Sequence, residues 1–256
     1  MQFAATPTRT HAPRVLILGG TTEASQLATH LAARSDVTVI SSLAGRVSQP
    51  RLPAGIVRVG GFGGVAGLIS YLLDEDIRVV IDATHPFASK ISSNAELACS
   101  TLGLPLIALD RAAWEPIEHD CWHRVPDTHA AASMVNHRLN RVFLSIGRQE
   151  LGAFSNCEHA WFLVRAIDAP SAMLPANSKL ILKRGPFHLN DELQMLRSES
   201  ISLIVSKNSG GTASYAKIEA ARALRIPVVM IDRPRKHNVP TVSQPGDVLQ
   251  NLEQLL

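Results

Sequence analysis

The chain has 256 residues, of which 46% are hydrophobic and 18% are charged, and its formal net charge is +3. This length suffices for one large or two modest domains with real apolar cores. The net positive charge is small, and the sequence contains no run of Lys or Arg and no alternation of basic with aromatic residues. A nucleic acid is therefore not an expected partner. No apolar run reaches the roughly 18 residues of a membrane span, so a membrane is not expected either.

Residues 1–13 lack the apolar core of a signal peptide, and we expect them to form a flexible leader. The chain contains three cysteines, Cys99, Cys121 and Cys157. They are odd in number and follow no disulfide spacing, which predicts reduced thiols and a cytoplasmic location. The histidines near Cys121 lack the paired spacing of zinc sites, so no metal is expected.

Apolar strands alternate with helical patterns along the chain, which is typical of βαβ proteins. Strands are predicted at residues 14–19, 37–41, 56–59, 78–82 and 105–109, and again at 141–146, 160–166, 179–183, 202–206 and 227–231. Helices are predicted at residues 22–34, 63–74, 88–102, 190–198, 211–224 and 246–255. Periodicity weakens between the two sets of strands, over residues 114–140. We therefore predict an α/β protein with two Rossmann-like domains, residues 14–125 and 126–256, and mostly parallel sheets.

The first predicted strand runs into Gly19-Gly20-Thr21-Thr22-Glu23, where a helix begins. Glycines allow the backbone to approach an anion, and the first N–H groups of a helix point at it. The turn matches the dinucleotide fingerprint G-x-G-x-x-G only loosely, so a tight turn without a ligand is the alternative.

The second predicted strand ends with Ser41 and Ser42, about twenty residues after the glycines, where an NAD-binding chain carries an acidic residue for the ribose 2′-hydroxyl. Two hydroxyls and Arg46 stand there instead. Hydroxyls and a guanidinium suit a 2′-phosphate, which favours NADPH over NADH. The alternative is that Arg46 is an ordinary solvated loop residue.

The two halves of the chain repeat one unit, in which a strand, a polar loop and a helix are followed by a second strand and Asp-Arg. The first copy spans residues 79–111, and the second spans residues 203–233. Two Rossmann-like domains related in this way collect their loops at the carboxyl ends of the strands, where open α/β sheets bind ligands. The active site is therefore expected in the cleft between the two domains.

Six segments together resemble the precorrin-6A reductase family of cobalamin biosynthesis. In chain order they are GGTTE at 19–23, SLAGR at 42–46, GGF at 60–62, DATHPFA at 82–88, RGPF at 184–187 and KNSGG at 207–211. The resemblance spans Val15 to Pro234. It implies an oxidoreductase that uses NADPH to reduce one double bond of the precorrin-6A macrocycle, giving precorrin-6B.

The resemblance, together with the chemistry of the side chains, implies two sets of binding residues. Cofactor contacts are expected from Gly19, Gly20, Thr21, Thr22, Glu23, Ser41, Ser42, Arg46, Gly61, Phe62, Asp82, Thr84, His85 and Pro86. Contacts with an anionic, tetrapyrrole-derived substrate are expected from Arg111, Arg184, Lys207, Asn208, Ser209, Gly210 and Arg233. A substrate with many carboxylates needs such cationic partners.

The sequence leaves several roles open. His85 and Lys207 are candidate catalytic proton donors, with water as a third possibility. The alternatives are that Asp82 only bonds to backbone, that His85 only caps a helix and that Lys207 is a solvated loop residue. Arg111 and Arg233 have the alternative of pairing with a neighbouring aspartate or a helix end.

Two other functions also fit the pattern. One is a cobalt-precorrin-6A reductase, since the motifs do not distinguish a metal-free from a cobalt-bearing substrate. The other is a non-catalytic NADPH-binding sensor, which would not need the basic loops of the second domain. Other enzymes of the pathway are possible partners for handing over the substrate.

Overall fold

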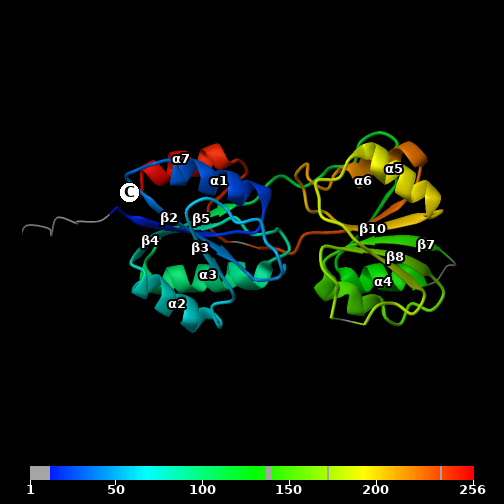
Figure 1. The fold of residues 1–256 in the computed structure, drawn as a ribbon, viewed down its shortest axis with the longest axis horizontal. Coiled ribbons are helices and arrows are strands. Elements are labelled where there is room, and N and C mark those ends of the chain that lie inside the picture. Colours follow the sequence, from blue (N-terminus) through cyan, green and yellow to red (C-terminus); the bar gives the residue numbers. More distant parts are fainter. Residues whose placement is uncertain (1–11, 137–139, 172, 237) are drawn as a thin grey trace, which may run out of the picture. The chain divides into compact units, whose positions relative to one another are not determined.

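The computed structural model describes residues 12–136, 140–171, 173–236 and 238–256 (Figure 1). It contains two compact units, one formed by the chain up to Asp110 together with Lys236–Leu256 and the other by Arg111–Arg235. Residues 1–11 of the expected leader lie outside the described residues. No helix in the described ranges is long and apolar enough to cross a membrane.

Unit 1 is a parallel six-stranded sheet with helices on both faces. Its strands are β1 (Arg14–Leu18), β2 (Thr38–Leu43), β3 (Ile56–Val59), β4 (Ile77–Asp82), β5 (Leu106–Leu109) and β12 (Thr241–Val242). Its helices are α1 (Thr22–Ala32), α2 (Val65–Asp74), α3 (Ser89–Leu102) and α7 (Pro245–Glu253). The spatial order β12-β5-β4-β1-β2-β3 is the Rossmann order, with its reversal between β1 and β4.

Unit 2 repeats this architecture. Its strands are β6 (Trp122–Val125), β7 (Arg141–Ser145), β8 (Trp161–Ala166), β9 (Ser178–Leu182), β10 (Leu203–Lys207) and β11 (Val228–Ile231). Its helices are α4 (Thr128–Asn136), the 3-10 helix η1 (Arg148–Phe154), α5 (Leu189–Ser198) and α6 (Ala216–Leu224). The strand order is β6-β11-β10-β7-β8-β9. As in unit 1, the order changes direction once, here between β7 and β10. The predicted fold class is therefore confirmed, and β4–β5 and β10–β11 hold the two copies of the repeat.

The units divide the chain differently from the expected ranges 14–125 and 126–256. Strand β6 pairs with β11, which assigns the segment before residue 126 to unit 2. Strand β12 pairs with β5, which returns the end of the chain to unit 1. Both strands were missed because they are short edge strands, of four and two residues, without an apolar run.

The sheet of unit 1 is covered on both faces (Figure 1). On one face, Leu27 and Leu31 of α1 and Val248 and Leu252 of α7 pack in one cluster with Val15 and its neighbours. Leu68 and Leu72 of α2 pack with the opposite face in a cluster that includes residues of α3. Such double coverage explains why the strands are continuous apolar runs rather than alternating ones.

In unit 2, helices α5 and α6 cover one face of the sheet and α4 lies on the other (Figure 1). Helix α6 begins at Ala216, five residues later than the predicted start at residue 211. Gly210 and Gly211 have φ angles of +66° and +68°, which are not helical. The segment is therefore a loop at the carboxyl edge of the sheet.

Leu252→Ala should destabilise unit 1, because Leu252 is completely buried against the cluster of α1 although it lies four residues from the end of the chain. A Leu-to-Ala change at such a site costs about 2–5 kcal/mol. Leu255→Ala is the matched control, since Leu255 is 43% exposed. Urea denaturation of both variants measures the difference, and equal midpoints would mean that α7 is not part of the core of unit 1.

Candidate active site

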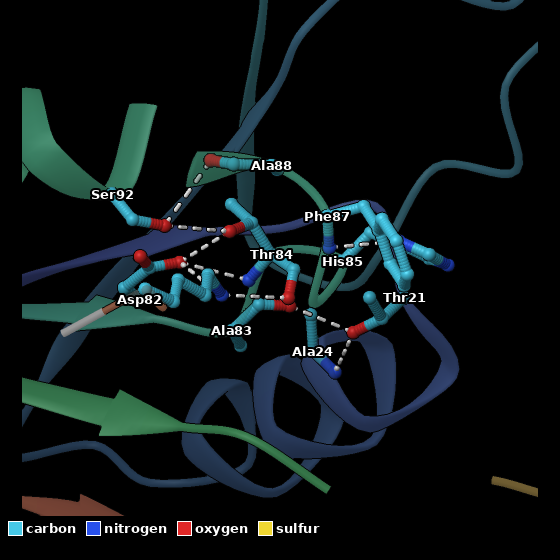
Figure 2. Close-up of polar contacts among 10 residues, drawn as sticks. Thr21, Ala24, Asp82, Ala83, Thr84, His85, Phe87, Ala88 and Ser92 are labelled. Atoms are coloured by element: carbon cyan, nitrogen blue, oxygen red, sulfur yellow. Dashed lines mark hydrogen bonds and ion pairs between the residues drawn. The ribbon is translucent and has the colours of Figure 1, made fainter. Parts of the chain in front are cut away.

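The turn between β1 and α1 begins with Gly19, whose N–H donates to the Ser42 carbonyl at 3.0 Å. Gly20 has a φ of +107°, and an added Cβ there would meet no atom within 4 Å. The Thr21 hydroxyl accepts from the Ala24 N–H at 3.1 Å and donates to the Ala83 carbonyl at 2.8 Å (Figure 2). Thr21 therefore starts the helix and ties it to the loop after β4, while the backbone at Gly20 faces open space.

The loop after β4 is built on Asp82, which is fully buried. Its Oδ1 accepts from the Thr84 N–H at 2.9 Å and from the Thr84 hydroxyl at 2.6 Å (Figure 2). The Thr84 hydroxyl is also 3.4 Å from that of Ser92 in α3. These bonds form an Asx-type turn, so Asp82 and Thr84 shape the loop from inside.

Lys236 completes this arrangement where the chain re-enters unit 1. Its Nζ lies 3.6 Å from Asp82 Oδ1 and donates to the Thr84 carbonyl at 3.1 Å. Both side chains are at least 97% buried. A buried charge is tolerated only when it is paired and hydrogen-bonded, so Asp82 and Lys236 depend on each other.

His85 follows this buried core and is partly exposed. Its Nδ1 lies 3.2 Å from the Phe87 N–H, which donates to it (Figure 2). An imidazole that accepts through Nδ1 carries its proton on Nε2 when neutral. The N–H of neutral His85 is therefore on Nε2, on the side of the ring away from the Phe87 N–H.

At the ends of β2 and β3, Ser42 pairs in register with Arg58. Ser41 and Ser42 are 2% and 6% exposed. The Ser42 hydroxyl accepts from Arg58 Nη1 at 2.8 Å, whereas the buried Ser41 hydroxyl has no partner among the described residues. Arg46 is exposed in the loop that follows. Arg58 was absent from the predicted site, although its position at the end of a strand was a usable signal.

The glycine-rich loop after β3 is held by the same arginine. Arg58 donates to the carbonyls of Gly60 and Gly61 at 3.0 and 3.1 Å, and its guanidinium lies 3.8 Å from the centroid of the Phe62 ring. Added Cβ atoms at Gly60, Gly61 and Gly63 would all meet open space. The loop is thus anchored on one side and open on the other.

In unit 2, the loop after β10 is hydrogen-bonded to the irregular segment through which the chain enters the unit, before β6. The Asn208 side chain accepts from the Trp114 N–H at 2.8 Å and donates to the Trp114 carbonyl at 2.9 Å. Arg111 donates to the Ser209 carbonyl at 2.8 Å, and Arg233 donates to the Asn208 carbonyl at 2.8 Å and to the Arg111 carbonyl at 2.7 Å. Both arginines therefore bind backbone and hold the loop, which is a structural role.

Gly210 lies in this loop, close to the residues that hold it. A Cβ there would fall 2.1 Å from the Ala112 carbonyl oxygen and 2.4 Å from Arg233 Nη2, so only glycine fits. Lys207, the last residue of β10, forms an ion pair with Glu150 of η1, and its side chain is 12% exposed. Lys207 is therefore not a solvated lysine. Arg184 is partly exposed in the loop between β9 and α5.

A family model described as "Precorrin-6x reductase CbiJ/CobK" matches residues 14–253. The chain belongs to this family. The precorrin-6A reductase of Rhodococcus erythropolis is 48% identical over 221 residues, which are 86% of this chain and 89% of that protein. The solved structure of CobK precorrin-6A reductase matches with a TM-score of 0.90 at 42% identity and covers 94% of this chain and 96% of that chain. The cobalt-precorrin-6A reductase of Priestia megaterium is 25% identical over 239 residues, which are 86% of this chain and 91% of that protein.

The resemblance stated from the sequence is thus confirmed, and this member of the precorrin-6x reductase family is an enzyme of the oxidoreductase class. Each predicted site residue lies at or next to the carboxyl edge of one of the two sheets. Within the described ranges, no group of three or more His, Cys, Asp or Glu side chains could hold a metal ion.

Unit 2 of this reductase also contains a buried charged cluster that the sequence did not reveal. Arg165 Nη1 on β8 lies 2.5 Å from Glu192 Oε1 on α5, and both side chains are at least 96% buried. Lys217 of α6 is 2% exposed and donates to the Ser214 carbonyl at 3.1 Å. Burial, reinforced by the Arg165 charge and opposed by Glu192, lowers the pKa of Lys217 from 10.5 to about 7.

Lys217→Met should stabilise the protein most below pH 7. In the window from about 7 to 10.5, the unfolded chain binds a proton on this lysine that the folded chain has released, so wild-type stability rises with pH. The advantage of the variant should therefore shrink across the window, by at most about 1.4 kcal/mol per pH unit.

Urea denaturation between pH 6.5 and 9.5 measures this slope. Lys179→Met is the control for the same substitution at an exposed lysine, because the Lys179 side chain is 55% exposed. A difference between Lys217→Met and wild type that stayed constant with pH would contradict the lowered pKa.

Proposed function

We propose that the protein is a precorrin-6A reductase that takes a hydride from NADPH and delivers it to one double bond of the macrocycle, giving precorrin-6B. Membership of the reductase family supports the reaction. The single observation that supports the cofactor most strongly is the open backbone at Gly20, next to the strand-order reversal of a Rossmann sheet.

In this proposal, the turn from Gly19 to Glu23 holds the pyrophosphate. The Thr21 hydroxyl accepts the hydrogen bond of the Ala24 N–H. The N–H groups of α1 before Ala24 have no acceptor within the helix. They lie at the positive end of the helix dipole, which attracts phosphate. Glu23 would repel a phosphate through its carboxylate, so we expect its contact to be made through its backbone N–H.

The ribose and its 2′-phosphate would lie at the ends of β2 and β3. Ser41 and Ser42 are there, with Arg46 in the exposed loop beyond and Gly61 and Phe62 in the neighbouring glycine loop. The absence of a carboxylate from these positions supports NADPH rather than NADH.

The nicotinamide would lie against the loop after β4. Pro86 and the Nε2–H of His85 are the contact groups in this proposal, while Asp82 and Thr84 position them from below. Bound NADPH supplies the hydride. The protein has to supply a proton to the neighbouring carbon, and His85, Lys207 and water are the three candidates.

The anionic substrate would contact the carboxyl edge of unit 2, through Arg184, Lys207 and the loop at Asn208, Ser209 and Gly210. Arg111 and Arg233 would act mainly by holding that loop, since their guanidinium groups already bind its backbone. Where cofactor and substrate meet stays a prediction. The cytoplasmic location and substrate handover to other pathway enzymes also stay predictions; the free thiols of Cys99, Cys121 and Cys157 agree with the former.

A cobalt-bearing substrate is the second candidate, and the comparisons favour the metal-free one, since identity falls from 48% to 25% between the two kinds of reductase. Assays with NADPH and either precorrin-6A or its cobalt complex decide between them. Binding of NADPH without turnover of either substrate would instead support the sensor.

Gly20→Val should abolish NADPH binding without unfolding the protein, because the new side chain would occupy the space through which a phosphate reaches the backbone. Gly103→Val is the matched control. Gly103 also has a left-handed φ, of +64°, and open space at Cβ, but it ends α3 at the opposite edge of the sheet. Calorimetric titration compares both with wild type, and unchanged affinity in folded Gly20→Val would remove the pyrophosphate from this turn.

Lys207→Ala should raise KM for precorrin-6A or lower kcat while leaving NADPH affinity within about twofold, since one charged contact contributes about 1.5–3 kcal/mol only to the step that uses it. Lys179→Ala is the control for a lost positive charge, because Lys179 is exposed on β9. Steady-state kinetics and cofactor titration separate the effects. Loss of NADPH binding in Lys207→Ala would assign the loop to the cofactor instead.

A further inference from the structure

We propose that Arg58 is a specificity-determining residue of this enzyme, which reads the 2′-phosphate of NADPH from the end of β3. The inference rests on the proposed use of NADPH and adds a residue that neither the sequence motifs nor the family resemblance includes. Arg58 would contribute more than Arg46 to the binding of the 2′-phosphate.

The first support is the way in which the guanidinium is held. Its bonds to the Ser42 hydroxyl and to the carbonyls of Gly60 and Gly61 use three of the five N–H groups. Within the described ranges, the Nε–H and one Nη2–H are left for a ligand. The rings of Phe62 and Tyr71, with centroids at 3.8 and 4.9 Å from Arg58 Cζ, further restrict its position. A guanidinium fixed in this way loses little conformational entropy when it binds a phosphate.

The second support is its place in the sheet. Arg58 is in register with Ser42 on β2, and Ser42 is in register with Leu18, the residue before the Gly19–Gly20 turn. Two strand spacings place the backbone of Arg58 about 10 Å from that turn. One nucleotide spans such a distance, so a cofactor with its pyrophosphate on the turn would bring its ribose towards Arg58.

The third support is electrostatic. From Val37 to Leu73 the chain contains Arg46, Arg51 and Arg58 but no Asp or Glu. A 2′-phosphate carries a charge of about −1.5 to −2 at neutral pH, so this segment attracts it without an opposing carboxylate. The open space in front of Gly60 and Gly61 leaves room for the ligand beside the guanidinium.

Arg46 and Arg58 make different predictions. Arg46 lies in an exposed loop, where charges are strongly screened by salt. Arg58 is partly buried and oriented by three hydrogen bonds, so its contact should persist at higher ionic strength. An oriented guanidinium can also bind a phosphate through two parallel hydrogen bonds, whereas a lysine keeps only the charge and therefore replaces it in part.

The test measures dissociation constants by calorimetry for NADPH, NADH, 2′,5′-ADP and 5′-AMP, with wild type, Arg58→Ala, Arg58→Lys, Arg46→Ala and Arg51→Ala. Arg58→Ala should reduce the preference for NADPH over NADH, and for 2′,5′-ADP over 5′-AMP, by roughly 10- to 100-fold. Arg58→Lys should recover only part of it. Arg46→Ala should show a smaller loss that disappears at high salt, and Arg51→Ala, an exposed charge in the same segment, should change the ratio little.

Equal weakening of NADPH and NADH in Arg58→Ala would show that Arg58 only holds the glycine loop and would overturn the inference. An equal loss in Arg51→Ala would overturn it too, since the effect would then be general attraction. The fragments 2′,5′-ADP and 5′-AMP report on the adenosine end alone, and Arg58→Lys keeps the charge if Arg58→Ala folds poorly. Failure of the proposed use of NADPH would be distinguishable from failure of the Arg58 inference, because wild type would then bind NADPH no better than NADH.

Discussion

The reversal of strand order beside β1 in unit 1 and beside β7 in unit 2 is the constraint on which both candidate sites depend. Neighbouring parallel strands are joined by crossovers, so all their carboxyl ends lie along one edge of a sheet. At the reversal, the loops after two adjacent strands run to opposite faces and leave room between them. The Gly19–Gly20 turn and the loop at Asp82 flank the reversal in unit 1, and the loop at Asn208 lies beside it in unit 2.

Polar groups that are buried or partly buried serve mainly to shape these loops. Asp82, Thr84 and Lys236 form the interior of one loop, and Asn208, Arg111 and Arg233 fasten the other. The cost of burying such groups is offset by pairing and hydrogen bonding. The contacts proposed for the ligands come from groups at the loop surfaces, such as the Gly20 backbone and His85, next to these hydrogen-bonded groups.

The connection between the units has a structural consequence at each of its two crossings. Arg111 and Arg233, near the points where the chain enters and leaves unit 2, both bind the loop after β10. Lys236, the first residue after unit 2, pairs with Asp82 inside unit 1. The two crossings thus supply parts of the scaffolds beneath the proposed substrate and cofactor contacts.

The fold class, most strands and helices, the repeat and the family follow from the sequence alone, because buried parallel strands are long apolar runs and the glycine turns are local signals. The short edge strands β6 and β12 were missed because their pairing depends on partners far along the chain. The ion pair between Lys236 and Asp82 was not predicted for the same reason. The place of Arg58 near a strand end was visible in the sequence, but its contact with Ser42 follows from the register of β3 against β2. The pKa of Lys217 is lowered only because folding buries this side chain near Arg165. Local chemistry and periodicity belong to the sequence; register, burial and the pairing of distant charges arise only when the chain packs.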